Sequence, residues 1–414
     1  MKTLKISPPQ NKQINGSIQL NGSKSISNRA LIIRALCDKD FIIENLSSAK
    51  DTVTLDHILN NLSHTIDAGA GGTTYRFLTT FLCCQKGRFE LTGSERMKER
   101  PIGVLVEALR GLGAKIDYLE NEGYPPLAIN GADIKGGKIT MPGDVSSQYL
   151  SALLMIAPTL KGGLELAWTG TLVSRPYLLM TLNLMKYFGA EWEWNDNSIV
   201  VKEGEYIAKS FYVEGDWSAA SYYYSIAALA DTAEITLQGL NEASVQGDSV
   251  IAEMANLMLV ESSFNQEDKT VLITKNQDSL ADSFYYDYLE CPDLAQTLIA
   301  MLGGLGIEGE FKGLQTLKIK ETDRVEAMRN EMAKFGVVFE ELDEENWKLS
   351  FDKDFHLKET PTIPTYEDHR MAMAIAPLCL KFGPIIIEEP EVVVKSYPDF
   401  WKDLESLGFE ITNN

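Results

Sequence analysis

Cations stand where an amphipathic helix is predicted to begin. In LNGSKSISNRALIIRAL, residues 20–36, the two cations are Lys24 and Arg29, and either Ser25 or Ser27 could cap the helix. The N-terminus of a helix is the positive end of its dipole, so a cation there costs about 0.3 kcal/mol or more. Free backbone N–H groups, hydroxyls and cations together form a site for a phosphate or carboxylate. We therefore expect an anionic ligand at this helix.

Four further helix starts in the first half of the chain repeat this combination of small, hydroxyl, amide and cationic residues. They are GAGGTTYRF with Gly72, Thr73, Thr74 and Arg76, GSERMKERPIG with Arg96, Lys98 and Arg100, GDVSSQYL with Ser146, Ser147 and Gln148, and VSRPYLL with Ser174. Thr73 or Thr74, Ser146 or Ser147, and Ser174 are predicted as N-caps, which is the commonest role of such residues in helices. The repetition of cations in a chain with net charge −21 favours a ligand as well.

Four segments in the second half add carboxylates to the cations. They are CPDLAQTL with Asp293, LKIKETDRVEAM with Lys318, Lys320, Glu321, Asp323 and Arg324, EDHRMAM with Asp368, His369 and Arg370, and KSYPDF with Lys395. Taken singly, they are explained by an N-cap or by local ion pairs at a solvated helix start. Taken together, they predict a large pocket for several anions.

Composition and motifs disfavour several other classes of protein. The net charge of −21 opposes binding to nucleic acid or to anionic membranes, and no apolar run reaches membrane-spanning length. GSKS lacks the spacing of a P-loop, and GAGGTT has Thr74 where a dinucleotide-binding fingerprint needs its third glycine. The five cysteines form no CxxC pair and the four histidines are scattered, so we expect reduced thiols and no metal. The N-terminal segment lacks the apolar core of a signal peptide, so we expect a cytoplasmic protein.

A repeated pattern of helix, short linker and strand organises the chain. Six such strands begin at residues 41, 88, 164, 234, 308 and 385, and successive starts are 47, 76, 70, 74 and 77 residues apart. Units of about 75 residues fit an α/β motif used six times better than a solenoid repeat. The interval of 47 residues predicts that the first unit of the second domain is shortened by a strand pair. Gly113, Gly189, Gly336 and Gly408 follow predicted helices, where left-handed C-caps are expected.

The segments above resemble, in order, the motifs of the 5-enolpyruvylshikimate-3-phosphate synthases, a family of enolpyruvyl transferases. The similar stretches cover nearly the whole chain and are GSKSISNRA, LTGSERMKERPIG, VSSQYLSALLM, SRPYLLMTLNLM, VEGDWSAASY, QGD, KETDRVEAM, EDHRMAM and KSYPDF. The resemblance implies an α/β fold, a two-domain inside-out α/β barrel with three βαβαββ-type units per domain. We expect one domain from residues 1–19 and 216–414, the other from residues 20–215, and the active site in the cleft between them.

The resemblance also implies a reaction and its residues. The enolpyruvyl group of phosphoenolpyruvate is transferred to the 5-hydroxyl of shikimate 3-phosphate, phosphate is released, and no cofactor takes part. By the same resemblance Asp293 accepts the hydroxyl proton, Glu321 handles the methylene proton and Lys24 assists. Residues implied to bind shikimate 3-phosphate are Lys24, Ser25, Arg29, Ser146, Ser147, Gln148, Ser174, Asp293 and Lys320, and those implied to bind phosphoenolpyruvate are Lys24, Gly72, Arg100, Gln148, Arg324, Arg370 and Lys395.

The chain departs from the family pattern near Gly72, and two alternative functions stay open. Phe77 stands where the family usually has proline, and Ala70 where it usually has asparagine. The related transferase that acts on UDP-N-acetylglucosamine shares the fold, but many of its members use a reactive loop cysteine that this chain does not resemble. A catalytically inactive anion-binding relative would gain nothing from Asp293 and Glu321 near its ligand. We expect a monomer whose partners are small-molecule substrates.

Overall fold

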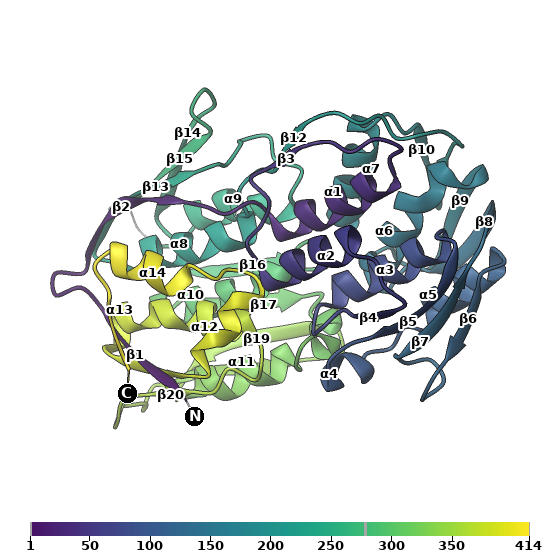
Figure 1. The fold of residues 1–414 in the computed structure, drawn as a ribbon. Coiled ribbons are helices and arrows are strands. Elements are labelled where there is room, and N and C mark those ends of the chain that lie inside the picture. The colour runs from purple at the N-terminus through teal and green to yellow at the C-terminus, as the bar shows by residue number, and fades with distance from the viewer. Residues whose placement is uncertain (1, 277–279, 414) are drawn as a thin grey trace. The chain divides into compact units, whose positions relative to one another are not determined.

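The chain folds into two compact units. The computed structural model describes residues 2–276 and 280–413. Unit 1 comprises residues 1–21 and 214–414, and unit 2 comprises residues 22–213 (Figure 1). The boundaries expected from the sequence, after residues 19 and 215, each lie two residues from these. Among the described residues, no helix is both long and apolar enough to cross a bilayer.

Unit 1 contains three four-stranded sheets with one common plan. Each has a parallel pair of strands, and the second strand of that pair is followed in the sheet by two further strands, each antiparallel to its neighbour. The strand orders are β2(Gln13–Gln19)-β13(Thr232–Gln238)-β15(Thr270–Lys275)-β14(Val260–Asn265), β16(Ser283–Asp287)-β17(Glu308–Lys312)-β19(Asn346–Phe351)-β18(Val337–Glu341), and β20(Thr362–Ile363)-β21(Ile385–Glu388)-β1(Thr3–Ser7)-β22(Glu410–Asn413).

Unit 2 repeats this plan twice in full and once in part. Its complete sheets are β4(Thr65–Asp67)-β5(Gly87–Thr92)-β7(Leu127–Gly131)-β6(Lys115–Tyr118) and β8(Lys135–Pro142)-β9(Lys161–Thr169)-β11(Ser198–Val201)-β10(Trp192–Asn195). The third sheet of its described residues has only the parallel pair β3(Ile43–Glu44) and β12(Phe211–Tyr212). The missing antiparallel hairpin is the strand pair that the short sequence interval predicts to be lost. All six predicted strands are present, as β3, β5, β9, β13, β17 and β21.

Each unit has buried helices at its centre and sheets outside them. In unit 1, α8(Trp217–Leu229), α10(Ala295–Leu305) and α12(His369–Ile375) contact one another, and almost every residue of α8 and all of α12 are buried. In unit 2, α1(Lys24–Leu36), α3(Gly72–Cys83) and α6(Ser147–Ile156) contact one another in the same way. The expected inside-out α/β arrangement is therefore confirmed.

The remaining helices connect the strands of each unit. They are α2(Lys50–Asn60), α4(Glu95–Lys98), α5(Gly103–Gly111) and α7(Arg175–Tyr187) in unit 2, and α9(Ile251–Asn256), α11(Arg324–Ala333), α13(Cys379–Phe382) and α14(Phe400–Ser406) in unit 1. The four predicted C-cap glycines follow α5, α7, α11 and α14, and all have positive φ, between 76° and 94°. This backbone conformation is left-handed and favours glycine, so the prediction of these caps is confirmed.

The N-terminal caps were predicted less well than the C-terminal ones. The cap of α1 is Ser23, whose side chain accepts a hydrogen bond from the Ile26 N–H, so the prediction of Ser25 or Ser27 was wrong. Gly71 precedes α3 and offers no side chain, so the prediction of Thr73 or Thr74 was also wrong. Both errors arise because the helices begin two to four residues earlier than the hydroxyl pattern indicates.

Two other predicted caps lie where the sequence places them. Ser146 caps α6 and accepts a hydrogen bond from the Gln148 N–H. Ser174 occupies the N-cap position of α7, but it makes no capping hydrogen bond and has a left-handed backbone with φ of 55°. A non-glycine residue in this conformation is strained by about 1–2 kcal/mol, and such strain is often found at functional sites.

Candidate active site

The candidate residues of unit 1 form one connected cluster. Asp293 lies in a short 3-10 helix, Pro292–Leu294, directly before the buried helix α10. Its carboxylate accepts hydrogen bonds from Arg324 Nη1 at 3.1 Å and from Arg370 Nη2 at 2.8 Å. Asp293 does not cap a helix, because Cys291 occupies the N-cap position. Its side chain is 22% exposed, so it lies at the edge of the core rather than inside it.

Arg324 links three carboxylates of this cluster. It is the first residue of α11 and its side chain is only 3% exposed. Besides Asp293, it donates to Asp368 Oδ2 through Nε at 2.7 Å and to Glu321 Oε2 through Nη2 at 3.0 Å. Asp368 also caps α12 by accepting from the Arg370 N–H, so the same carboxylate fixes both arginines. The guanidinium groups of Arg324 and Arg370 both donate hydrogen bonds to Asp293.

Glu321 and the two lysines complete the cluster. Lys395 Nζ donates to Glu321 Oε1 at 2.8 Å, while Arg324 holds the other carboxylate oxygen. Lys320 ends the 3-10 helix Gln315–Ile319, and its positive charge acts on Asp293. Six residues that the sequence singles out are thus brought together by folding, namely Asp293, Lys320, Glu321, Arg324, Arg370 and Lys395.

Opposing effects act on the ionisation of Asp293. Burial alone would raise the pKa of this carboxyl, but the positive charges of Arg370, Lys320 and Arg324 outweigh burial and lower the pKa below its ordinary value. Burial lowers the pKa of Arg324, whereas Asp368, Glu321 and Asp293 raise it, and the net direction is upward. Asp293 and Arg324 are therefore both charged at neutral pH.

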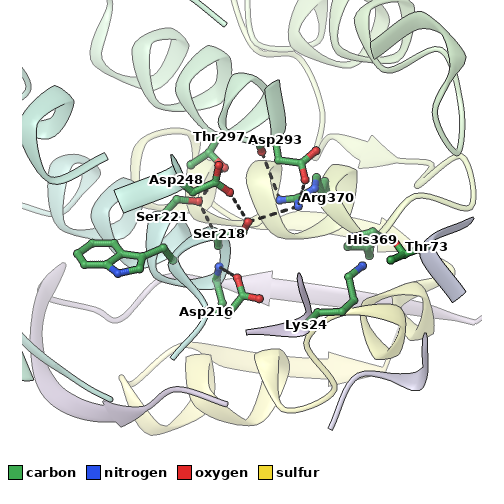
Figure 2. Close-up of polar contacts among 12 residues, drawn as sticks. Lys24, Thr73, Asp216, Ser218, Ser221, Asp248, Asp293, Thr297, His369 and Arg370 are labelled. Atoms are coloured by element: carbon green, nitrogen blue, oxygen red, sulfur yellow. Dashed lines mark hydrogen bonds and ion pairs between the residues drawn. The ribbon is translucent and has the colours of Figure 1, made fainter. Parts of the chain in front are cut away.

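Arg370 also contacts residues that the sequence did not assign to the site. Its Nη1 donates to the Tyr222 hydroxyl at 3.4 Å, and its Nη2 donates to Ser218 Oγ at 3.5 Å. The Ser218 hydroxyl in turn donates to Asp248 Oδ2. Figure 2 shows Asp248, Ser218, Arg370 and Asp293 joined in this order. Ser218 and Asp248 lie in VEGDWSAASY and QGD, so motif membership was a signal that could have identified them.

In unit 2, Lys24 begins α1 and has an acidic neighbour. Its Nζ lies 3.7 Å from Asp51 Oδ2, and Asp51 belongs to the adjacent helix α2. The main-chain oxygen of Asp51 accepts from the Thr74 hydroxyl of α3 at 3.0 Å. Asp51 therefore ties together the starts of α1, α2 and α3. Asp51 could not be selected from the sequence, because the segment around it carries no motif.

Gly72 and Arg100 are in direct proximity. Gly72 is the first residue of α3, and a Cβ atom at this position would lie 2.7 Å from Arg100 Nη1. Arg100 follows the short helix α4 and is 6% exposed. The absence of a side chain at residue 72 thus leaves room for the guanidinium beside the N-terminus of α3.

A polar chain connects α3 with α6. Gln148, the second residue of α6, accepts from Arg76 Nη1 and donates to Thr73 Oγ1 at 2.8 Å. The Arg76 guanidinium also lies over the ring of Tyr149, 5.1 Å from its centroid. Gln148 is thereby held beside the start of α3, close to the predicted anion site at Gly72.

Arg29 is among the most deeply buried of the predicted ligands. It is 2% exposed and donates to Thr181 Oγ1 at 2.7 Å, to Ser151 Oγ at 3.1 Å and to the Ser25 carbonyl at 2.9 Å. Its guanidinium also faces the Phe77 ring at 5.4 Å. Burial lowers the pKa of Arg29 to about 10, so the side chain stays charged at neutral pH. Phe77, the departure from the family pattern, therefore packs against a predicted ligand.

The arrangement has definite chemical capacities. Arginine and lysine side chains at helix N-termini can bind phosphate and carboxylate groups, and guanidinium groups can do so through two hydrogen bonds at once. Asp293 and Glu321 are carboxylates within a partly buried cationic cluster, where they can exchange protons with a bound substrate. Among the described residues, no group of three or more His, Cys, Asp or Glu side chains could hold a metal ion. The burial of Cys83, Cys291 and Cys379 raises the pKa of their thiols, so these cysteines are poor nucleophiles at neutral pH.

Comparison with known proteins agrees with this site and fold. The sequence matches the family described as EPSP synthase (3-phosphoshikimate 1-carboxyvinyltransferase) over residues 8–67 and 63–404. A 3-phosphoshikimate 1-carboxyvinyltransferase of Bacteroides fragilis (strain YCH46) is 48% identical over 401 residues, covering 96% of this chain and 97% of the relative. One of Sulfurovum sp. (strain NBC37-1) is 37% identical over 431 residues, covering 96% and 97%.

Solved structures extend the likeness to the fold. A structure titled EPSP synthase from Acinetobacter baumannii has a TM-score of 0.78 and 20% sequence identity, and the match covers 99% of each chain. Fold, site and sequence together define an enolpyruvyl transferase. The chain belongs to the EPSP synthase (3-phosphoshikimate 1-carboxyvinyltransferase) family.

Proposed function

We propose that the chain transfers the enolpyruvyl group of phosphoenolpyruvate to the 5-hydroxyl of shikimate 3-phosphate with release of phosphate. The observation that carries this proposal is the cluster of Asp293 and Glu321 with Arg324, Arg370 and Lys395, in which two carboxylates share three cations. Such a cluster can bind an anionic substrate and exchange protons with it at the same place. Family membership favours this reaction over the transfer to UDP-N-acetylglucosamine and over an inactive anion binder.

We assign the proton transfers to the two carboxylates. Asp293 accepts the proton of the 5-hydroxyl as the oxygen attacks C2 of phosphoenolpyruvate. Glu321, with assistance from Lys24, protonates the methylene carbon. A C–O bond forms, the bound tetrahedral adduct loses phosphate, and removal of a methyl proton restores the enol ether. The cations that pair with Asp293 and Glu321, namely Arg324, Arg370 and Lys395, are released to the substrate anion when it binds, because phosphate and carboxylate compete for the same N–H donors.

We assign substrate binding to the residues of both units. Arg324, Arg370 and Lys395 in unit 1, with Gly72 and Arg100 in unit 2, bind phosphoenolpyruvate. Shikimate 3-phosphate is bound by Lys24, Ser25, Arg29, Ser146, Ser147, Gln148 and Ser174 in unit 2 and by Asp293 and Lys320 in unit 1. Lys24 and Gln148 serve both substrates. Each substrate carries a phosphate and a carboxylate group, so the two bring several negative charges to the cations of a chain whose net charge is −21.

Replacement of the two carboxylates tests this assignment. We expect Asp293→Ala and Glu321→Ala each to lower kcat by about 10²–10⁴, because that is the usual contribution of a general acid or base. Phosphate release from the two substrates measures the rate. Glu326→Ala is the matched control, because Glu326 forms a more exposed pair with Arg329 at 2.7 Å within the same helix region.

The same assay distinguishes the alternative functions. Near-normal turnover in Asp293→Ala and Glu321→Ala would refute their proposed roles. Activity of the unaltered protein only with UDP-N-acetylglucosamine would favour the related transferase, and binding of both substrates without turnover would favour an inactive relative. We further propose that the protein acts in the cytoplasm as a monomer.

A further inference from the structure

Asp248 is a buried carboxylate that no step of the proposed reaction uses. It lies in the 3-10 helix Gly247–Val250, directly before α9, and is 5% exposed. One of its oxygens, Oδ2, accepts a hydrogen bond from Ser218. The other, Oδ1, is buried and has no hydrogen-bond partner among the described residues. Burying a carboxylate with half of its acceptors unsatisfied is costly, so its presence requires a compensating role.

The contact between Asp248 and Ser218 bears on the substrate-binding arginine. A serine hydroxyl has one hydrogen and can donate it in only one direction. Because Ser218 donates to Asp248, its lone pairs are left to accept from Arg370 Nη2, 3.5 Å away. The second hydrogen of Nη2 is donated to Asp293 at 2.8 Å. The orientation of the Arg370 terminal nitrogen is thus fixed from both sides (Figure 2).

We propose that Asp248 is a positioning residue that acts through the Ser218 hydroxyl to hold the Arg370 guanidinium ready for the anionic substrate. This inference rests on the proposed function, because it assigns Arg370 to phosphoenolpyruvate. The hydrogen bonds that connect Asp248 with Arg370 pass through the Ser218 hydroxyl. Loss of either Asp248 or Ser218 should therefore have the same consequence.

The charges around Asp248 make this arrangement sensitive to pH. The charged and titratable groups that face it are Asp216 at the start of α8, Cys291 and Asp293 before α10, and Arg370 of α12. Burial raises the pKa of Asp248 to about 7, the charge of Asp293 adds to this, and Arg370 and Ser218 act in the opposite direction. Above this pH, ionised Asp248 accepts the Ser218 hydrogen. Below this pH, protonated Asp248 can instead donate a hydrogen bond to the Ser218 oxygen. The Ser218 hydrogen then no longer points at Asp248 and can turn toward the N–H of Arg370, which it would repel.

Steady-state kinetics of Ser218→Ala test the proposal. We expect the KM for phosphoenolpyruvate to rise about tenfold at pH 8, with kcat and the KM for shikimate 3-phosphate within twofold, because only substrate binding to Arg370 is weakened. Ser218→Thr retains the hydroxyl and should restore most of the affinity. Ser221→Ala is the matched control, because Ser221 lies one turn further along α8 and its hydroxyl contacts the Ser218 carbonyl and Thr297.

Two further measurements separate positioning from a general loss of structure. Asp248→Ala should add nothing to the KM for phosphoenolpyruvate once residue 218 is alanine, since the two residues act in series; Asp248→Asn replaces it if the alanine variant does not fold. The ratio of this KM between Ser218→Ala and the unaltered protein should be larger at pH 8 than at pH 6. The ratio cancels the ionisation of phosphoenolpyruvate itself.

The outcomes are distinguishable. If the unaltered protein is active but Ser218→Ala changes the KM for phosphoenolpyruvate less than twofold, the positioning role is overturned and the proposed function stands. Additive effects of Ser218→Ala and Asp248→Ala, or a ratio independent of pH, would also overturn it. An unaltered protein that neither binds nor turns over phosphoenolpyruvate would refute the proposed function, and the inference with it.

Discussion

At the scale of single residues, the candidate site is defined by cations that already have carboxylate partners. Asp293 accepts from both Arg324 and Arg370, and Glu321 accepts from both Arg324 and Lys395. A buried arginine without any counter-charge would be costly, so these carboxylates stabilise the cluster before a substrate arrives. When an anionic substrate takes over the cations, the carboxylates become free to accept protons. The same residues can therefore serve stability and catalysis in turn.

The space at Gly72 gives a prediction at this scale. In Gly72→Ala the new Cβ would lie 2.7 Å from Arg100 Nη1, closer than such contacts allow, so the buried guanidinium must shift. We expect the KM for phosphoenolpyruvate to rise about tenfold, equivalent to about 1.4 kcal/mol, while the KM for shikimate 3-phosphate changes less than twofold. Gly111→Ala is the control, because nothing lies within 4 Å of its added Cβ. An unchanged KM would show that Arg100 does not bind phosphoenolpyruvate at this position.

At the scale of elements, the candidate residues gather at the N-terminal ends of the central helices. In unit 2, Lys24 begins α1, Gly72 begins α3, and Ser147 and Gln148 begin α6. In unit 1, the corresponding residues are Ser218 at the start of α8, Asp293 just before α10, and Arg370 at the start of α12. Each unit repeats one βαβαββ plan, so each repeat presents one helix terminus with free N–H groups. Repetition of the fold thus multiplies a single kind of anion site.

The C-terminal ends of helices depend on glycine, and two positions allow this to be measured. Gly306 and Gly336 have similar φ of +74° and +76°, but an added Cβ at Gly336 would lie 2.5 Å from the Phe355 ring, whereas nothing lies within 4 Å at Gly306. We expect Gly306→Ala to lower the free energy of unfolding by about 1 kcal/mol from backbone strain alone. Gly336→Ala should cost about 1–3 kcal/mol more, because a side chain must also move.

Both glycines belong to unit 1, so urea unfolding of the two variants compares like with like. Equal losses would mean that Phe355 moves aside at no cost. A larger loss at Gly306 than at Gly336 would contradict the structural argument.

At the scale of the whole molecule, the sequence predicts the repeated units better than it predicts which distant side chains contact one another. The six strands and four C-cap glycines follow from local patterns, and the shortened unit follows from counting residues between strands. The ion pairs of Asp293 with Arg324 and Arg370 join residues 31 and 77 positions apart, and no periodicity encodes such distances. The burial of Arg29 against Thr181 and Ser151, 152 and 122 positions away, has the same origin. Roles for these residues came from resemblance to a family, whereas their contacts required the structure.

The buried charge of Asp248 predicts how the stability of the protein depends on pH. Its pKa is raised to about 7 from an ordinary value of 3.8, chiefly by burial, so between these values the folded state binds a proton that the unfolded state has lost. Stability from this group therefore falls as pH rises toward 7 and is then constant. Asp248→Asn cannot ionise, so it should gain stability relative to the unaltered protein between pH 5 and pH 8. The gain should be about 3 kcal/mol, from about two units of pH at about 1.4 kcal/mol each.

Thermal unfolding at pH 5 and pH 8 measures this gain, and Asp343→Asn provides the control. Hydrogen bonds from the Glu345 N–H and from Asn346 lower the pKa of Asp343, so its titration lies below pH 5 and its contribution is the same at both pH values. The difference in Tm between Asp248→Asn and the unaltered protein should thus grow from pH 5 to pH 8, whereas that of Asp343→Asn should not. A constant difference for Asp248→Asn would mean that this carboxylate is already ionised at pH 5, and that Arg370 and Ser218 stabilise its charge more than burial opposes it.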